Sequence, residues 1–422
     1  MSLRVAAVDL NGQWRGKRLP ASHAEKARRG GVRMPLSAAG LDVAGLDPEG
    51  SPLVLPLGDA DGWLVPTGRE APMPWLDRPA TLIAASLARE DGTPFAADPR
   101  VALAAAVERW RERGLEPVAA VEMEFVLADP AAPLRPPLSP LTGRRLASEG
   151  TLSLARLDEF ARFLDAVEAG AEAMGLPLDG MISEGCPGQF EVNLSHRGAL
   201  EAADDAALLK LLVRGTACAQ GLSASFLAKP YPDASGSGMH VHLSWERGGR
   251  NASAEVLPSA VAGCLAAMPD GTAILAPHGV SFARLAPGHF APTACAWGRE
   301  NRTVAIRLPG GPPEAVRLEH RAAGADANPH LLLAAILGAA LMGVEDALEP
   351  PPPVEGNAYA REDLPRLAPG WAEAVERLGS PLMARVLDPF LLEILAVTKR
   401  HEVARFGGAA AATLEAVYRD AV

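Results

Sequence analysis

Five short segments of the chain place polar side chains, many of them able to bind cations or anions, on one face of a strand. In each segment polar and apolar residues alternate, which is the period of an extended strand whose two faces differ. The segments are 121–125, 189–194, 239–244, 303–308 and 316–321. One such segment alone is typical of a half-exposed strand with a solvated face. Several of the five are flanked by apolar sequence, so we expect their polar faces to converge inside the domain.

Glutamates are the most frequent acidic residues among these polar positions. Glu122 and Glu124 share a face of the first segment, Glu191 lies in the second, and Glu319 lies in the last. Glu184 precedes the tight turn that leads into the second segment. Converging carboxylates raise one another's pKa and cannot all stay ionised without cations. Oxygen-rich sites with a single imidazole suit Mg²⁺ or Mn²⁺ rather than zinc, so the pattern predicts divalent cations of this kind.

Basic residues and a Gly-rich turn accompany the glutamates. The remaining polar positions in or just before the segments include His240, His242, Ser244, Arg302, Arg307, Arg317 and Arg321. Arginines need anions, and phosphates fit their bidentate geometry. The third segment follows the Gly-rich stretch 235–238, which is a weak signal alone, and no P-loop motif is present. Together, hard cations, arginines and a Gly-rich turn predict phosphoryl transfer from a nucleotide.

The composition is that of a globular protein: 422 residues, 48% hydrophobic and 22% charged. The net charge of -11 argues against a general nucleic-acid binder. Four scattered cysteines predict a reducing compartment, and the first residues lack the apolar run of a signal peptide, so we expect a cytoplasmic location. Residues 327–344 carry no charge. Asn328 resembles an N-cap within that stretch, which we interpret as a buried core helix rather than a membrane span.

Turn and strand patterns divide the chain into a small β-rich unit at 1–85 and a larger remainder, with a boundary near 88–95. Strands are predicted at 5–9 and 52–57, and 11–17 is predicted to be a turn. Further helices are predicted at 98–114, 153–174, 201–222, 254–268, 371–379, 383–405 and 409–420.

Several motifs occur in a fixed order along nearly the whole chain from Asp9. They are Arg15-Gly16-Lys17, Asp91-Gly92-Thr93-Pro94, Glu122-x-Glu124, Gly188-Gln189-x-Glu191, Gly236-Ser237-Gly238-Met239-His240-x-His242, Asn301-Arg302-Thr303, Arg317-x-Glu319-x-Arg321 and Gly324-Ala325-Asp326-Ala327-Asn328-Pro329. Each motif alone is weak, but their joint occurrence in this order is specific. The chain thereby resembles the glutamine synthetase superfamily.

This resemblance implies an α+β protein with a small N-terminal β-grasp domain at 1–90. A large catalytic domain at 91–422, with a curved antiparallel sheet flanked by helices, would follow. It implies ATP, two Mg²⁺ or Mn²⁺ ions, and a γ-glutamyl phosphate intermediate that an amine attacks. It also implies a ring-type homo-oligomer, with a dodecamer as the expected form, because family active sites form between subunits.

The resemblance further assigns expected roles to individual residues. One metal ion would be held by Glu124, Glu184 and Glu191, and the other by Glu122, His240 and Glu319. The glutamate carboxylate and the ATP phosphates would be bound by Arg284, Arg302, Arg307, Arg317 and Arg321, with the backbone of Gly236 also contacting glutamate. Ser244 would contact the nucleotide. The residues expected to take part in the chemistry are Arg302, Arg321, His242 and Glu191.

The flap segment departs from the ammonia-using members of this family. Those members carry a glutamate there, in a Gly-Tyr-Glu-Ala-Pro-like context, whereas 287–292 of this chain has Phe290 at the carboxylate position. A latch aspartate near residue 40, in an Asp-Gly-Ser-Ser context, is also missing. Ammonium needs negative charge for binding and deprotonation. A phenyl ring instead offers the apolar wall that an organic amine requires. The stretch 296–303 also resembles the γ-glutamylpolyamine synthetase-like branch.

Three hypotheses remain open at this point. The first is a glutamate–amine ligase that uses an organic amine or polyamine. The second is a true glutamine synthetase in which Asp42, Asp47 or His289 replaces the ammonium site. The third is a non-catalytic relative, which the complete set of metal-binding residues disfavours, because unneutralised buried glutamates are costly in an inert core.

Overall fold

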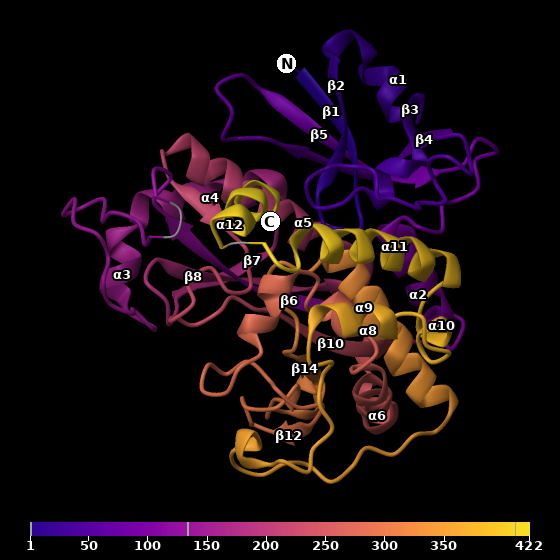
Figure 1. Ribbon diagram of the computed structural model, residues 1–422, viewed down its shortest axis with the longest axis vertical. Coiled ribbons are helices and arrows are strands. Elements are labelled where there is room, and N and C mark those ends of the chain that lie inside the picture. Colours follow the sequence, from indigo (N-terminus) through magenta and orange to yellow (C-terminus); the bar gives the residue numbers. More distant parts are fainter. Residues whose placement is uncertain (1, 133–134, 410) are drawn as a thin grey trace.

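The computed structural model describes residues 2–132, 135–409 and 411–422. Two sheets organise the chain, and helices pack around the larger one (Figure 1). The first sheet contains β1 (Ser2–Val8), β2 (Trp14–Pro20), β3 (Val32–Pro35), β4 (Asp61–Pro72) and β5 (Ala80–Ala88) in the order β2-β1-β5-β4-β3. Only the β1–β5 pair is parallel in this sheet. The prediction of a β-rich N-terminal unit is confirmed.

Two local predictions in this unit are wrong. Residues 52–57 form consecutive turns instead of a strand, and Leu55 is 89% exposed. The two prolines of this segment lack the N–H groups that a strand would donate to a neighbour. The predicted turn at 11–17 is shorter, because β2 already begins at Trp14. The Asp9 carboxylate closes the turn by accepting bonds from the backbone N–H groups of Asn11 and Gln13, both at 2.9 Å.

The second sheet carries the segments that the sequence singled out. Its main path is β12 (Trp297–Arg299), β13 (Ile306–Leu308), β14 (Leu318–His320), β10 (Met239–Arg247), β6 (Glu116–Ala128), β8 (Gln189–Gly198) and β7 (Leu178–Ser183). Two short strands, β9 (Ser223–Ser225) and β11 (Arg250–Asn251), pair with β6 and β10. All pairs are antiparallel except β12 with β13. The α+β fold class is confirmed, with mixed sheets flanked by helices.

The last two predicted strands are shorter than expected. Strand β13 lacks the predicted residues 303–305, and β14 lacks 316–317 and 321. Polar side chains form hydrogen bonds with the backbone groups that would otherwise extend these strands. The side-chain amide of Asn251 donates to the carbonyl of Val316 at 2.9 Å, and the Asn301 side chain accepts from the backbone N–H of Thr303 at 2.9 Å.

Helices occur at the predicted positions, with some interruptions, and the short helices α1 and α7 are additional. They are α1 (Ala24–Arg28), α2 (Pro99–Arg111), α3 (Leu154–Glu159), α4 (Ala161–Met174), α5 (Ala199–Ala219), α6 (Leu257–Ala267), α7 (Thr272–Leu275), α8 (Pro329–Glu345), α9 (Trp371–Arg377), α10 (Met383–Val386), α11 (Pro389–Phe406) and α12 (Ala411–Ala421). The predicted helix at 153–174 is divided at Phe160, and that at 383–405 is divided before Pro389. Residue 410, in the last predicted helix, lies outside the described residues.

Helix α8 is the uncharged stretch, and the prediction of a buried core helix is confirmed. The Asn328 side chain caps its first turn by accepting from the N–H groups of His330 and Leu331. Helix α6 packs so closely against α8 that a β-carbon on Gly263 would lie 2.1 Å from the carbonyl oxygen of Ala339. Among the described residues, no helix is long and apolar enough to cross a membrane.

Strand β6 shows why the larger sheet has a reactive face. Val121, Met123 and Phe125 point into the hydrophobic core and are at most 1% exposed. Glu122 and Glu124, which alternate with them, must therefore lie on the opposite face. Burial of three apolar side chains fixes the register, because a slip of one residue would bury the two glutamates in the core instead.

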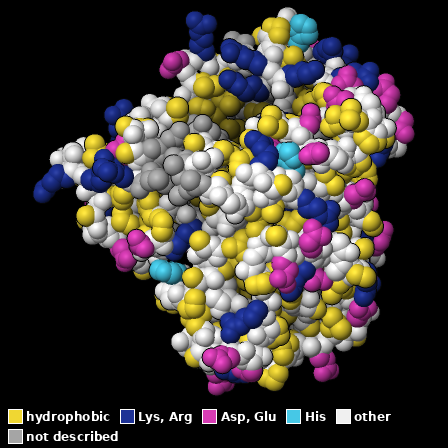
Figure 2. All heavy atoms as spheres, in the orientation of Figure 1, with side chains coloured by type: hydrophobic (Ala, Val, Ile, Leu, Met, Phe, Trp, Pro, Cys, Tyr) yellow, Lys and Arg dark blue, Asp and Glu magenta, His cyan; other side chains and the backbone are white. Residues whose placement is uncertain are grey.

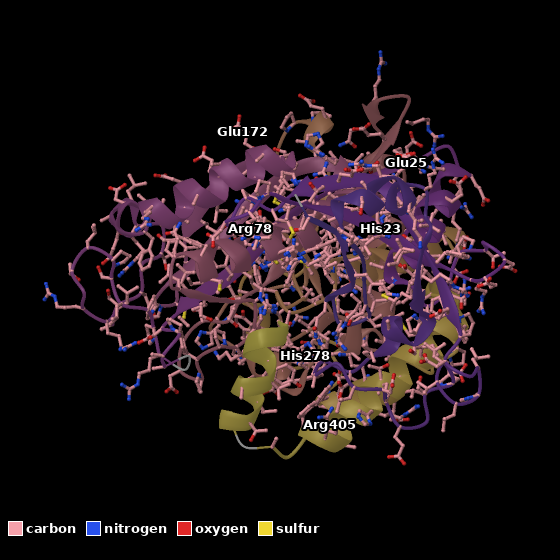
Figure 3. All side chains as sticks on the ribbon, turned by 90° about the horizontal axis from the view of Figure 1, so that it is seen from above. His23, Glu25, Arg78, Glu172, His278 and Arg405 are labelled. Atoms are coloured by element: carbon pink, nitrogen blue, oxygen red, sulfur yellow. The ribbon has the colours of Figure 1, made fainter. Side chains whose placement is uncertain are left out.

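A buried polar cluster joins the N-terminal unit to the C-terminal helices. Lys399 of α11 donates to the side-chain oxygen of Asn11 and, at 2.9 Å, to Glu402. Glu402 also accepts from the side-chain amide of Asn11 at 3.0 Å and from the N–H of Val43 at 2.8 Å. Figure 3 labels a neighbour of this cluster, His278, beside the two C-terminal helices in yellow; its ring lies 3.7 Å from Glu402.

Substitution of Lys399 by Met tests this connection. Removing one partner of a buried ion pair leaves the other charge unpaired, and we expect a loss of about 3–5 kcal/mol in the free energy of unfolding. Arg400→Met on the same helix is the matched control, because Arg400 pairs with Glu376 on the exposed surface. That substitution should cost less than about 1 kcal/mol. Urea unfolding at one fixed protein concentration measures both, and equal losses would contradict a connecting role for Lys399.

Candidate active site

Antiparallel register places the predicted metal-binding residues opposite one another, or opposite a site histidine, on four strands. Glu122 of β6 faces His240 of β10, and Glu124 of β6 faces Glu191 of β8. On the other side of β10, His242 is the partner of Glu319 in β14. Opposite residues on one face of an antiparallel pair have β-carbons about 4.5–5.5 Å apart. The predicted convergence of these side chains is therefore confirmed.

Glu122 lies at the centre of this arrangement, between two imidazoles. His240 Nδ1 lies 3.1 Å from one of its carboxylate oxygens, and His242 Nε2 lies 2.8 Å from the other. Burial works to raise the pKa of Glu122, but the hydrogen bonds with His240 and His242 outweigh it and hold that pKa well below its usual range. Glu122 is therefore ionised.

Arg317 fixes the tautomer of His242. The guanidinium Nε of Arg317 donates to His242 Nδ1 at 3.1 Å. Because Nδ1 is thereby an acceptor, Nε2 is the ring nitrogen that donates to Glu122. His240 is neutral at pH 7, because burial and the nearby Arg321 charge lower its pKa to about 4.

Three further glutamates repel one another on the β7–β8 side of the site. Burial, followed by the charges of Glu124, Glu122 and Glu184, raises the pKa of Glu191 to about 9. Burial also raises the pKa of Glu124 to about 7 and that of Glu184 above its usual value. Glu124 accepts hydrogen bonds from the Gln189 side chain at 3.1 Å and from the backbone N–H of Gly238 at 2.8 Å.

Glu319 has a different environment, because two arginines contact it. Arg307 donates to it at 2.6 Å, and Arg321 forms an ion pair with its other oxygen. Burial opposes ionisation, but the charge of Arg321 and the hydrogen bond from Arg307 hold the pKa of Glu319 below its usual range.

These donors fit divalent metal ions. Two groups bring ligand atoms within 4.8 Å of one another: Glu122, His242 and Glu319 form one, and Glu122, Glu191 and His240 form the other. Mixed carboxylate and imidazole donors, with oxygen in excess, suit Mg²⁺ or Mn²⁺. A cation would also remove the repulsion that raises the pKa of Glu191. His242 belongs to one of these groups, although the family resemblance did not assign it to a metal ion. Glu124 and Glu184, which the resemblance did assign to a metal ion, belong to neither group.

The Gly-rich turn before β10 allows an arginine to lie against the site. Arg284 is buried and donates to the backbone carbonyls of Ala322 at 3.1 Å and Arg321 at 3.3 Å. A β-carbon on Gly238 would lie 2.5 Å from a guanidinium nitrogen of Arg284. One on Gly236 would lie 2.3 Å from the carbonyl of Ala228. Both positions therefore need glycine if Arg284 is to keep its place beside Glu124, to which its charge is coupled.

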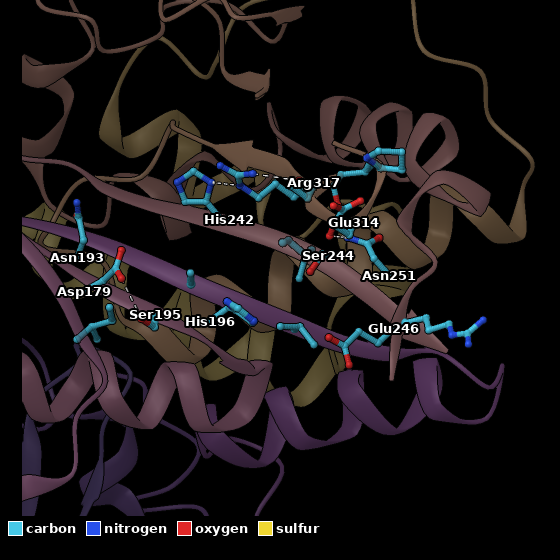
Figure 4. A pocket seen from close by; sticks show the side chains of 18 of the residues that line it. Asp179, Asn193, Ser195, His196, His242, Ser244, Glu246, Asn251, Glu314 and Arg317 are labelled. Carbon is cyan, nitrogen blue, oxygen red and sulfur yellow. Dashed lines mark hydrogen bonds between the residues drawn. The ribbon is translucent and has the colours of Figure 1, made fainter. Parts of the chain in front are cut away.

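A polar cavity of about 940 Å³ opens beside the glutamates (Figure 4). Glu122, His242, Ser244 and Arg317 line it, as expected for residues that face a nucleotide and its phosphates. Figure 4 shows Ser244 on the same strand as His242, with Arg317 reaching over to the imidazole. The predicted positions of Ser244 and Arg317 thus share one cavity.

His196 also lines this cavity, although the sequence analysis gave it no role. Simple alternation along β8 places His196 on the opposite face from Asn193. The pairing of β6 with β8 shifts between Ala119 and Val121, so that Ser195 and His196 both lie opposite one residue, Ala120. Such a bulge redirects a side chain, and both Ser195 and His196 line the cavity. A bulge of this kind leaves no signal in an alternating pattern.

Phe290 and Arg302 lie at a second cavity, of about 520 Å³. Phe290 is 59% exposed at the tip of its loop, with a left-handed backbone φ of 53°. Arg302 is exposed as well, but its charge acts on Glu184 of the carboxylate group. The structure thus brings the glutamates, the two histidines, Ser244 and four arginines together, and places Phe290 and Arg302 at a second opening.

Comparisons with known proteins agree with this geometry. The family model described as glutamine synthetase, catalytic domain, matches residues 96–416. Gamma-glutamylputrescine synthetase PuuA of Escherichia coli (strain K12) is 39% identical over 375 residues, which cover 86% of this chain and 79% of that protein. Glutamate–isopropylamine ligase of Pseudomonas sp is 32% identical over 414 residues, covering 92% and 88%.

A solved structure shares the whole architecture. The crystal structure described as a novel glutamine synthase homolog superposes with a TM-score of 0.85 at 28% identity, covering 100% of this chain and 98% of that one.

Neutralising single carboxylates tests the metal site. Glu124→Gln and Glu319→Gln should each lower kcat/KM by at least about 100-fold, because even residues that only support metal ligands typically cost 10–100-fold. Glu319→Gln should also weaken Mn²⁺ binding measured by isothermal titration calorimetry. Glu116→Gln is the matched control, since Glu116 lies on the same strand but pairs with Arg111 at the surface. Mn²⁺ binding and turnover of wild-type strength in Glu319→Gln would contradict the site.

Proposed function

Because this chain belongs to the glutamine synthetase family, we propose that it joins glutamate to an organic amine as a γ-glutamyl amide, using ATP through a γ-glutamyl phosphate intermediate. Two relatives that span most of the chain are named for such reactions with putrescine and isopropylamine. The observation that carries the choice of an amine over ammonia is Phe290, an apolar side chain at the flap position where ammonia-using members carry a carboxylate.

The chain's own residues explain how the first step would be supported. Divalent metal, when bound to the carboxylates and imidazoles, polarises the γ-carboxyl group and withdraws charge from the ATP phosphates. Arg284 and Arg321 would hold the substrate glutamate; both are buried, which strengthens their interaction with a carboxylate. Arg317 would meet the phosphates on the cavity side. Arginines aimed in advance at developing charge lower the barrier without having to reorganise during the reaction.

The second step requires a neutral amine. The amine nitrogen attacks the acyl carbon, the bond from that carbon to the phosphate oxygen breaks, and phosphate leaves with the bonding pair. A protonated amine has no lone pair for this attack. An apolar wall formed by Phe290 on flap closure would disfavour the ammonium form and lower the pKa of the amine.

One of the three residues that could replace the ammonium site in the glutamine synthetase alternative is not available for that role. Asp42 is buried and its carboxylate pairs with Arg405, while its other oxygen accepts from the N–H of Leu46 at 2.8 Å. A carboxylate engaged in this way is not free to bind ammonium. Asp47 and His289 are exposed, so these two residues remain candidates for an ammonium site and the ammonia alternative can be tested.

We also propose finer properties that fit this function. The protein would carry two divalent ions per site and form a ring-type homo-oligomer, a dodecamer, in the cytoplasm. The N-terminal and catalytic domains would meet at residues 90 and 91, between the end of β5 at Ala88 and the start of α2 at Pro99. On the face seen in Figure 2, several basic side chains lie at the top, over the N-terminal sheet, with acidic side chains beside them at the upper right, and charges of both signs are mixed below.

An amine panel tests the function. Purified protein with ATP, glutamate and Mg²⁺ is given putrescine, isopropylamine, ethanolamine or ammonia, and both ADP and the γ-glutamyl amide are measured. We expect amide formation with at least one organic amine at a higher kcat/KM than with ammonia. A preference for ammonia over every amine would favour a glutamine synthetase, and no turnover with any of them would favour a non-catalytic relative.

Phe290→Glu tests the reason for the preference. A carboxylate at the flap tip would bind ammonium and accept its proton, so ammonia should gain relative to the best amine by about 1–3 kcal/mol in the ratio of kcat/KM values. His289→Glu adds the same charge at the neighbouring residue and serves as the control. An equal shift in both variants would show that added charge, and not the position of Phe290, changes the preference.

A further inference from the structure

A segment after α8 contacts two loops of the active site at once. We call residues 354–366 the clasp and residues 285–295 the flap. In Figure 1 the golden loop that follows α8 passes β12 at the bottom of the view. The N–H of Val354 donates to the carbonyl of Trp297 in β12 at 2.8 Å, which fixes the start of the clasp on the sheet.

The clasp holds both sides of the Arg302 loop. The Asn301 side-chain amide donates to the clasp carbonyls of Val354 at 3.0 Å and Gly356 at 2.8 Å. On the other side of Arg302, the hydroxyl of Thr303 accepts from the N–H of Ala358 at 3.0 Å. Arg302 is therefore presented from a backbone that the clasp fixes at the residues before and after it.

The same clasp holds the second arm of the flap. The Tyr359 hydroxyl donates to the carbonyl of Ala291 at 3.1 Å. Further along, Arg366 donates to the hydroxyl of Thr293 at 3.1 Å. The N–H of Cys295 donates to the carbonyl of Pro365 at 2.8 Å, so clasp contacts occur along the second arm of the flap from Ala291 to Cys295.

Among these contacts, Tyr359 is the one whose phenol the buried arginines of the site influence. Burial raises the pKa of this phenol, and the charges of Arg321 and Arg284 oppose that rise. Arg284 is also the last residue of the short 3-10 helix that leads directly into the flap. The flap is thus held at its start by Arg284 and, at Ala291 beyond the exposed tip, by Tyr359.

We propose that Tyr359 is a positioning residue that holds the flap to the Arg302 loop, so that the two close together over the acyl phosphate and exclude water. This inference rests on the proposed ligase function. Tyr359 itself touches the flap backbone and not the reacting atoms. Its hydrogen bond to Ala291 joins the flap to the clasp close to Arg284 and Arg321.

Water exclusion matters because two nucleophiles compete for the same carbon. When the amine attacks, one ATP yields one amide, one ADP and one phosphate. When water attacks instead, the bond from carbon to the phosphate oxygen still breaks, but glutamate is regenerated and ATP is hydrolysed without product. The ratio of ADP to amide therefore reports flap closure, whereas a general loss of stability would lower both rates together.

Tyr359→Phe tests the proposal, with ADP and γ-glutamyl amide measured in one reaction. The wild type should form about one ADP per amide at saturating amine. The variant should form roughly two- to tenfold more ADP per amide, which is the range expected from the loss of one ordinary hydrogen bond. The KM for the amine should rise and the KM for ATP should stay unchanged. A ratio and KM values equal to those of the wild type would overturn the proposal.

Tyr418→Phe is the matched control, because it removes the same hydroxyl from a buried tyrosine of α12. Equal uncoupling in both variants would also overturn the proposal. Failure of the ligase function looks different, since the wild type would then form no amide at all.

Hydrogen exchange on the wild-type protein tests the proposal without any variant. ATP and glutamate with Mg²⁺ should slow exchange in flap and clasp peptides together. Protection of the flap without the clasp would refute the coupling.

Discussion

The crowding of carboxylates on one face of the larger sheet is the constraint on which the rest of the structure depends. Glu122, Glu124, Glu191 and Glu319 are held on adjacent antiparallel strands whose other face is the hydrophobic core. Side chains in such positions cannot turn away from one another without a change of register, and a change of register would bury the charges in the core. The repulsion is therefore fixed by the fold, and it raises the pKa of Glu191 to about 9.

The negative charges of these glutamates are compensated to different degrees by the cationic and neutral donors around the site. Arg307 and Arg321 neutralise Glu319, and two imidazoles stabilise the ionised form of Glu122. The described side chains that act most strongly on the pKa of Glu191 include no arginine and no imidazole. The site is consequently incomplete without a cation at its β8 side. Such an arrangement costs stability in the metal-free protein and favours tight binding of a hard metal ion, since the ion relieves the repulsion.

Rigid and movable parts of the site have different origins. The metal-binding residues lie on paired strands, whereas Phe290 and Arg302 lie on loops that hydrogen bonds from the clasp connect. Loops can change position, whereas a strand register cannot. The loops that carry Phe290 and Arg302 would therefore control the access of the amine and of water to the site. This division would let related enzymes change the amine by altering the flap and keep the phosphoryl-transfer centre unchanged.

Much of the fold and the site could be predicted because the governing interactions are local. Alternation along 121–125 and 239–244 placed the glutamates and histidines on one face, and Asn328 marked the start of α8, since strand period and helix capping involve neighbouring residues. The departure at Phe290 could likewise be read without coordinates. Tertiary structure alone decided which residues meet: the pairing of Glu124 with Glu191, the ion pair that removes Asp42 from the ammonium alternative, and the contact of Tyr359 with Ala291. It also decided the bulge that turns His196 into the cavity. These features depend on contacts between segments up to 363 residues apart and on strand irregularities. A one-dimensional pattern carries no information on such contacts, because their energies arise only after distant segments have packed.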